Sequence, residues 1–282
     1  MISRLGLGGL LLGMLYAAAV LAGALTPYDP IHQDLAFALF SPSQFHPFGC
    51  DQLGRDVMSR VVHGARISLA IGTMATLLST LLGVTVGVIA GAGGRAGSLM
   101  MRGIDLALAF PTLVLLLVLA SLWPTDNWLA LIGLLALTTW MPTARLVRAE
   151  TLALSRRPFM EAAQSAGAPP LRRLVRHVIP NVASTVLVAA TLQVGDMMLL
   201  ESGLSYLGLG VTPPTPSWGD MVRQGMQHLG DAWWLTVFPG LALALAVIGF
   251  NLLGDGLRDL LEPRLAFSFP GRLWRSSTSS ES

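Results

Sequence analysis

Residues that could do catalytic chemistry are few in this sequence, and their spacing argues against an enzyme. Gly203-Leu204-Ser205 would suit an intramembrane serine protease, but that chemistry needs a histidine in a later span. The only later histidine is His228, which falls in a predicted loop. The five histidines stand at positions 32, 46, 63, 177 and 228, and no pair has the i, i+4 spacing of a metalloprotease helix. The sequence therefore predicts neither a catalytic centre nor a metal site.

The basic residues exclude further chemistry. All 18 of them are arginine, so a P-loop, which needs a lysine on the nucleotide phosphates, is impossible in this chain. A lysine Schiff base is excluded for the same reason. Cys50 is the only cysteine, so no intrachain disulfide can form. The chain is not an ATPase by itself, and we expect it to bind no cofactor.

Composition indicates that lipid is the solvent for much of the chain. Of its 282 residues, 53% are hydrophobic and only 12% are charged, with a mean hydropathy of +0.63. Soluble domains carry about 25% charged residues. The formal net charge of +2 gives no reason to expect a nucleic-acid partner. These values predict a membrane protein.

Apolar runs of about 20 residues, the length that crosses a bilayer as a helix, predict an all-α protein with six spans. Thr138, Thr139 and Pro142 interrupt the fourth span, which we expect to kink. A cleaved signal peptide is the alternative interpretation of the first. The six spans are Leu5–Leu25, Ile67–Gly91, Leu106–Trp123, Trp128–Leu146, Val182–Leu200 and Trp233–Leu253.

Arginine placement predicts that both termini are cytoplasmic. With that orientation only four of the 18 arginines lie outside, namely Arg55, Arg60, Arg66 and Arg223, and fourteen lie on the cytoplasmic side. Cytoplasmic loops are the ones that carry excess arginine. Two long outer loops follow from this arrangement, running from Thr26 to Arg66 and from Glu201 to Ala232.

Carboxylates beside the spans are candidates for a transport path. An ionisable residue inside a membrane is a functional-site hypothesis by default. Asp105, Asp196, Glu201 and Asp255 all fall near predicted span ends, where solvation lowers their cost. Asp196 is the candidate path residue, with an ordinary interfacial position as the alternative.

Three glycines in the second predicted span have four-residue spacing, at Gly83, Gly87 and Gly91. This spacing puts them on one helical face, where two backbones can approach closely. We expect a packing face; a hinge is the alternative.

The cytoplasmic loop between the fourth and fifth predicted spans carries the most local information. Phe159–Ala166 favours helix, and Gly167 can adopt the left-handed conformation that ends it. Proline at positions 169 and 170 can begin a second, arginine-rich helix, which we expect Pro180 to break. The result is a short helix-turn-helix with Glu161 in its first turn. An interfacial amphipathic helix on anionic lipid is the alternative.

The string Glu161-Ala162-Ala163, with Gly167 four residues later and an Ile-Pro pair ending at Pro180, resembles the EAA loop of permease subunits in bacterial ABC importers. In that family the loop forms a coupling helix that docks in a groove on the ATPase. The resemblance implies that these five residues form the ATPase-docking loop, within about residues 156–181.

Segments 49–69, 204–219 and 251–259 are similar to the C-type subunit of peptide and nickel importers, although a threonine is usual where Cys50 stands. The resemblance covers about residues 5–265. It implies three parts: a first span and outer segment (1–66), a permease core (67–265) and a disordered cytoplasmic tail (266–282). It also implies partners: a B-type permease, two ABC ATPases that bind ATP and Mg²⁺, a periplasmic substrate-binding protein and membrane lipid.

We therefore expect a non-catalytic, multi-pass permease subunit in the bacterial inner membrane that imports di- or oligopeptides by alternating access. Nickel or metal-chelate import by the same architecture is one alternative. An ion-gradient-driven secondary transporter is another, but it would need polar groups at mid-membrane, and the predicted spans are nearly free of them.

Overall fold

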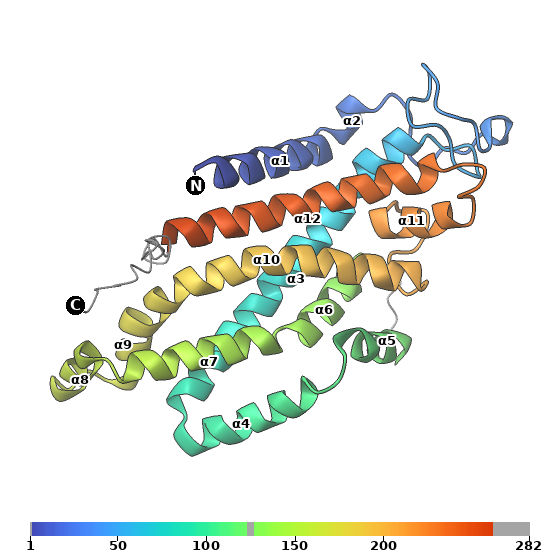
Figure 1. The fold of residues 1–282 in the computed structure, drawn as a ribbon. Helices are drawn as coiled ribbons and strands as arrows, with labels where there is room; N and C mark the ends of the chain where they lie inside the picture. Colours follow the sequence, from blue (N-terminus) through green and yellow to red (C-terminus); the bar gives the residue numbers. More distant parts are fainter. Residues whose placement is uncertain (1, 123–126, 262–282) are drawn as a thin grey trace, which may run out of the picture.

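The chain is built from α-helices, as the sequence predicts. The computed structural model describes residues 2–122 and 127–261, apart from the side chains of residues 2 and 3. Within those ranges the only β-type pairing is one isolated bridge between Cys50 and Asp56. The predicted tail (266–282) and Trp123, the last residue of the third predicted span, lie outside the described residues. Figure 1 shows long helices side by side, with shorter ones at both ends.

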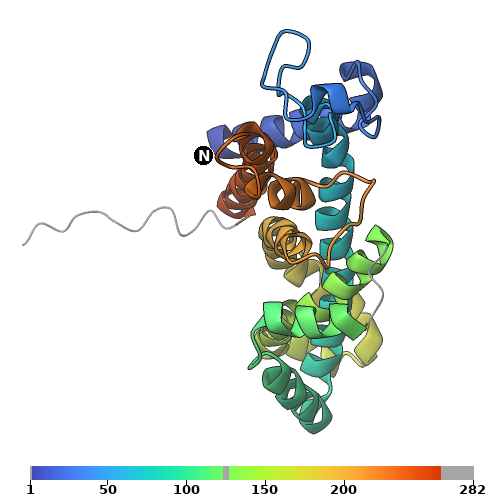
Figure 2. The ribbon, with the colours of Figure 1, turned by 90° about the vertical axis from the view of Figure 1, so that its right-hand side faces the viewer.

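One long helix, α3 (Val57–Ala92), organises the molecule. It contacts α1 (Ile2–Val20), α10 (Ile179–Tyr206) and α12 (Trp234–Leu261), and also α6 (Trp128–Thr139) and α7 (Met141–Ser155). Figure 2 shows α3 crossing the other long helices, which are stacked along it. The start of α1 packs against the end of α12, because a Cβ added at Gly8 would lie 2.7 Å from the Leu253 nitrogen. The two helices are therefore antiparallel.

Three helical segments are long and apolar enough to cross a membrane, or up to five if each bent pair counts as one span. The single segments are α3, α12 and the continuous run Pro170–Tyr206. The first predicted span corresponds to α1, which is apolar but shorter, followed by the one-turn helix α2 (Ala22–Leu25). Six spans thus remain a prediction, whereas the all-helical class is confirmed.

The third predicted span, Leu106–Trp123, is wrong as a single helix. The chain forms α4 (Gly94–Ala107) and α5 (Thr112–Leu122), which meet at 86°. Pro111 lies at the junction, and a proline disfavours helical geometry in the residue before it. The fourth predicted span bends as expected, with 43° between α6 and α7 just before Pro142.

The close-packing prediction for the glycine face is confirmed. The three glycines Gly83, Gly87 and Gly91 pack α3 directly against α7. A Cβ added at Gly87 would lie 2.6 Å from the Ala144 carbonyl oxygen, and one added at Gly91 would lie 2.6 Å from Thr151 Cβ. No real Cβ approaches so closely, so these two backbones touch because the side chains are absent.

The two segments predicted to be outer loops, called the outer segments below, fold onto the ends of α3 and α12. Residues 27–56 contain one short 3₁₀ helix, η1 (Leu35–Phe37), and the later outer loop contains α11 (Trp218–Met226). Trp218 Nε1 donates to the Val61 carbonyl at 2.8 Å, and Trp234 Nε1 donates to the Cys50 carbonyl at 3.2 Å. Two buried tryptophans therefore fasten the outer segments to the bundle.

Candidate functional site

The cytoplasmic loop predicted from the sequence is a helical turn at one end of the molecule. Its first helix is α8 (Pro158–Ser165), and α9 (Pro170–Arg173) follows. Gly167 has φ +77°, its N–H bonds to the Gln164 carbonyl at 2.9 Å, and the Ala168 N–H bonds to the Ala163 carbonyl at 3.0 Å. These bonds make the Schellman ending that glycine favours, so the predicted turn is confirmed.

The predicted break at Pro180 is wrong. A π-helical turn, η2 (Leu174–Val178), joins α9 to α10, and Pro180 lies in the first turn of α10. A first-turn proline costs little because its missing N–H has no helical partner there. The side-chain amide of Asn181 donates a hydrogen bond from Nδ2 to the His177 carbonyl at 2.6 Å, which satisfies an acceptor next to the distorted turn. The α8–α9 loop is thus continuous with a long apolar helix.

The α8–α9 loop is anchored on one side and open on the other. Met160 is buried with Val88, Val147, Val178 and Val182, which belong to α3, α7, η2 and α10. Arg173 donates to the Gln164 side chain at 2.8 Å and so ties α9 to α8.

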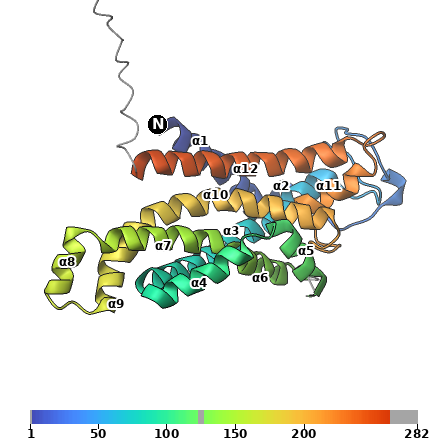
Figure 3. The same ribbon diagram turned by 60° about the horizontal axis from the view of Figure 1, so that its bottom comes forward.

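The open side of the loop combines small, acidic and apolar residues. Glu161 and Ala162 are exposed, and Ala163 is half-buried. Phe159 and Leu171 expose 43% and 72% of their surface. Figure 3 shows α8 and α9 projecting beyond the other helices at this end. Apolar residues on a projecting turn are typical of a surface that another protein covers.

Asp196 lies on the wall of a groove between α10, α5 and the α6–α7 bend. The groove has a volume of about 800 Å³ and also contains Gln193, Thr139 and Pro142. Asp196 is ten residues before the end of α10, so the sequence-based placement at a helix end was wrong. The helix simply runs further than the apolar pattern indicates. Sixteen residues of helix, about 24 Å, separate Asp196 from Pro180, so the groove and the α8–α9 loop are separate sites.

A buried polar network, which the sequence did not single out, lies beside this groove. Gln193 Nε2 donates to Ser79 Oγ at 3.0 Å and to the Thr139 carbonyl at 3.1 Å. Thr139 Oγ1 donates to the same Ser79 hydroxyl at 3.2 Å. The network therefore joins α3, α10 and the α6–α7 bend. A glutamine inside an apolar span was the one available signal.

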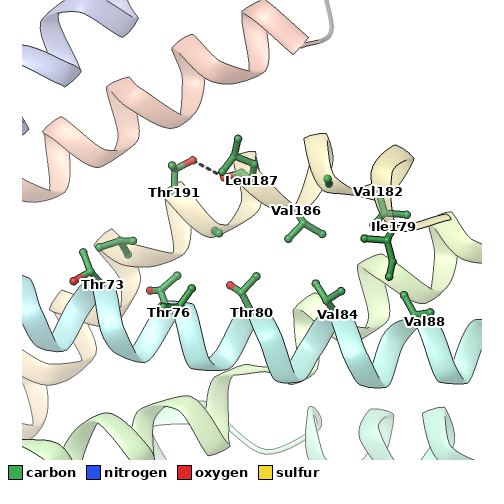
Figure 4. Close-up of a pocket in the computed structure, with 14 residues that line it drawn as sticks. Thr73, Thr76, Thr80, Val84, Val88, Ile179, Val182, Val186, Leu187 and Thr191 are labelled. Atoms are coloured by element: carbon green, nitrogen blue, oxygen red, sulfur yellow. Dashed lines mark hydrogen bonds between the residues drawn. The ribbon is translucent and has the colours of Figure 1, made fainter. Parts of the chain in front are cut away.

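A second groove lies on the other side of α10, between it and α3, with a volume of about 390 Å³ (Figure 4). Its wall is apolar apart from threonines. Thr76 and Thr191 donate to carbonyls of their own helices, at Gly72 and at Leu187 and Val188. With its hydroxyls mostly used in this way, this groove offers little to a polar solute, in contrast to the groove that holds Asp196.

Glu201 and Ser205, both in α10, pair with each other. Glu201 is buried, and Ser205 Oγ donates to its carboxylate at 2.8 Å. The serine is thus engaged by a carboxylate rather than by a histidine. Within the described ranges, no three His, Cys, Asp or Glu side chains are grouped as a metal ion would need.

An all-helical chain with several membrane-length apolar segments belongs to the class of multi-pass membrane proteins. Residues 83–267 match the model of a family described as binding-protein-dependent transport system inner membrane component. The chain belongs to that family. It is therefore the membrane component of a transport system that also uses a binding protein.

Similar proteins agree with this assignment. The di/tripeptide transport system permease protein DppC of Pseudomonas aeruginosa is 40% identical, over 92% of this chain and 88% of that protein. A Brucella ovis protein named as a candidate peptide permease is 42% identical, over 84% of this chain and 80% of that protein. The inward-facing MetNI methionine ABC transporter structure has a TM-score of 0.55 at 18% identity, covering 72% of this chain and 97% of that one. That similarity concerns the fold.

Proposed function

We propose that this chain is the C-type permease subunit of an ATP-driven ABC importer, and that it moves di- or oligopeptides across a bacterial inner membrane by alternating access. Membership of the family indicates that the chain is part of a transport system. The observation that carries the proposal is the α8–α9 loop, which projects beyond the other helices as a surface that can dock an ATPase (Figure 3). The chain contributes the path and the coupling surface. ATP and Mg²⁺ are bound by two separate ATPase subunits, and this chain binds no cofactor.

The α8–α9 loop is the ATPase-docking surface. Glu161, Ala162 and Ala163 form its open face, Gly167 makes the turn, and Pro180 begins the helix that leads away from it. Small alanines allow a helix to enter a groove closely, and the exposed Phe159 supplies apolar area. Movement of the ATPases would reach the membrane through α10, since η2 joins it to the loop without interruption.

The groove that holds Asp196 is this subunit's contribution to the translocation path. A homologous B-type permease would cover its open side. Asp196 and Gln193 give the wall polar groups that a peptide backbone or terminus can use. The apolar groove between α3 and α10 lacks them.

The proposed orientation places the loop in the cytoplasm. The start of α1, the end of α12 and the α8–α9 loop lie at the same end of the molecule (Figure 1). That end holds most of the arginines, which favours the cytoplasmic side. The segments at the opposite end then face the periplasm, where the substrate-binding protein docks.

Peptides are favoured as cargo because the relatives from Pseudomonas aeruginosa and Brucella ovis carry peptide-transport names. Nickel or metal-chelate import is the second candidate, resting on the shared sequence motifs alone. Uptake by the reconstituted complex with its binding protein decides between them. Labelled dipeptide should accumulate when ATP is present. Accumulation of Ni²⁺ without accumulation of dipeptide would favour the second candidate.

Docking is tested with Ala162→Trp, which places a bulky side chain on the open face of α8. The expected result is loss of ATPase co-purification and of ATP-driven uptake. Ala153→Trp, at an exposed position of α7 outside the loop, is the matched control and should retain both. Undiminished ATPase binding by Ala162→Trp would remove the loop from the interface. Transport by the chain alone in liposomes, driven by an ion gradient, would replace the importer by a secondary transporter.

A further inference from the structure

A second basic surface lies near the α8–α9 loop but is separate from it. Where α3 ends and α4 begins, a cavity of about 630 Å³ opens between these helices and α7. Its lining includes Gly91 and Gly94 and three arginines, Arg95, Arg102 and Arg148. None of these residues belongs to the α8–α9 loop or to the groove that holds Asp196.

The arginines of this cavity form no ion pair with any described residue. Across the described part of the chain, Arg95, Arg102 and Arg148 form no ion pair, whereas Arg145 pairs with Asp105 on the neighbouring stretch of the same helices. Arg95 and Arg102 are exposed, so an anion can reach their side chains from outside.

Arg148 also carries an unused donor. One of its terminal nitrogens donates to Ser98 Oγ at 3.0 Å, which holds the side chain against α4. Its Nε is buried and has no hydrogen-bond partner. A buried donor without an acceptor is unfavourable, so an acceptor on a bound molecule would stabilise this side chain. Planar guanidinium groups suit the paired oxygens of a phosphate especially well.

The surroundings indicate where that phosphate comes from. Leu99, in the cavity wall, exposes 69% of its surface, and Leu106 on the same helix exposes 68%. Leu152 of α7 is 37% exposed at the opposite wall. A soluble anion makes no favourable contact with exposed leucines, whereas a phospholipid has acyl chains beside its phosphate that can pack against them. The cavity lies where α3 ends, and the proposed orientation, on which this inference rests, puts that end on the cytoplasmic side.

We propose that this cavity binds the headgroup phosphate of an anionic phospholipid from the cytoplasmic leaflet, with Arg95, Arg102 and Arg148 as its ligands. The bound lipid fills the gap between α4 and α7 and holds α4 against the end of α3.

The test uses the purified transporter complex in nanodiscs that contain phosphatidylcholine with a minor fraction of phosphatidylglycerol, and native mass spectrometry counts the retained lipids. The wild type should retain phosphatidylglycerol in preference to phosphatidylcholine. Replacing all three arginines by glutamine should remove this preference. Each arginine lost should lower the affinity for phosphatidylglycerol about fivefold, the factor expected for one arginine at an anionic surface. Arg4→Gln, at an exposed position of α1 outside both the cavity and the α8–α9 loop, is the control and should change little.

Ser98→Glu provides a second variant that keeps every arginine. It places a carboxylate beside Arg148 and should displace the lipid from within the chain. Equal retention of phosphatidylglycerol by the wild type, the triple variant and Ser98→Glu would overturn the proposal. Displacement of phosphatidylglycerol by millimolar inorganic phosphate would overturn the lipid assignment and leave a site for a soluble phosphate.

Discussion

Gln193 donates a hydrogen bond to the main-chain carbonyl of Thr139, 3.1 Å away, at the bend where α6 meets α7. The bend leaves this acceptor without a regular helical partner, and a side chain from α10 supplies the donor. The geometry of the α6–α7 bend therefore depends on a residue more than fifty positions later in the chain.

Replacing Gln193 by leucine should destabilise the protein by about 1–3 kcal/mol, because the Thr139 carbonyl and the Ser79 hydroxyl would lose a buried donor. Thermal unfolding of the purified protein in detergent measures this effect. Gln227→Leu, at an exposed position after α11, is the matched control and should change the midpoint little. An unchanged midpoint for Gln193→Leu would mean that water or another donor replaces the amide.

Asp51→Asn should be more damaging than a typical outer-segment substitution. Asp51 accepts from Arg55 Nε at 2.6 Å and lies 3.4 Å from Arg60 Nε, and all three side chains are buried. Removing the anion leaves two arginines buried without their counter-ion, at a cost of about 3–5 kcal/mol. Limited proteolysis between residues 27 and 56 should accelerate in this variant. Asp29→Asn, at an exposed turn, should not change the cleavage rate.

Gly87→Ala should separate α3 from α7, because the new Cβ would meet the Ala144 carbonyl at 2.6 Å and a backbone atom cannot rotate away. Overpacking of this kind costs about 1–3 kcal/mol. The control is Gly133→Ala, since an added Cβ there meets nothing within 4 Å and should be neutral or slightly stabilising. Equal stability of the two variants would contradict the close packing of α3 against α7 at Gly87.

Cys50 should resist thiol reagents at neutral pH. The thiol is buried, and burial, helped by the nearby Asp56, Asp51 and Asp34 carboxylates, raises its pKa to about 11. The reactive thiolate is therefore scarce below that pH, and maleimide labelling of the native protein should rise only as pH approaches 11. Denaturation in SDS at pH 8 should restore ordinary labelling. Rapid labelling of the native protein at pH 7 would show that the outer segment opens.

The low reactivity expected of Cys50 makes the wild-type chain a suitable background for testing orientation. Ser155→Cys, at the exposed end of α7, should be labelled in inside-out vesicles and protected in intact cells. Ser41→Cys, exposed in the outer segment, should show the opposite pattern. The reverse result would invert the proposed topology and place the α8–α9 loop outside the cell.

Local signals predicted local structure well. Gly167 and the two prolines after it define the α8–α9 turn, and the spacing of the three glycines indicates a packing face, because each depends on neighbours in sequence. The prediction that Pro180 breaks a helix was wrong because a proline breaks a helix only in its interior. Here α10 begins at Ile179, directly after η2, so Pro180 lies in its first turn. Asp196 was placed at a helix end because apolar pattern, not hydrogen bonding, set the predicted boundary.

Contacts between residues far apart in the chain could not be predicted from the sequence. The outer segment has almost no regular structure, and it is held by Asp51, Arg60 and tryptophans from distant helices. The three arginines of the phosphate cavity are separated by up to fifty-three positions, so only the packing of α4 against α3 and α7 brings them together. The same is true of Gln193, whose partners lie on two other helices.

The length of α3 has a mechanical consequence. Its 36 residues extend about 54 Å, well beyond the hydrocarbon thickness of a bilayer, and no proline interrupts them. One end is clamped by the outer segment and the other borders the arginine-lined cavity. A rod held in this way behaves as a lever: a tilt imposed on one side of the membrane is delivered to the other without a joint to absorb it.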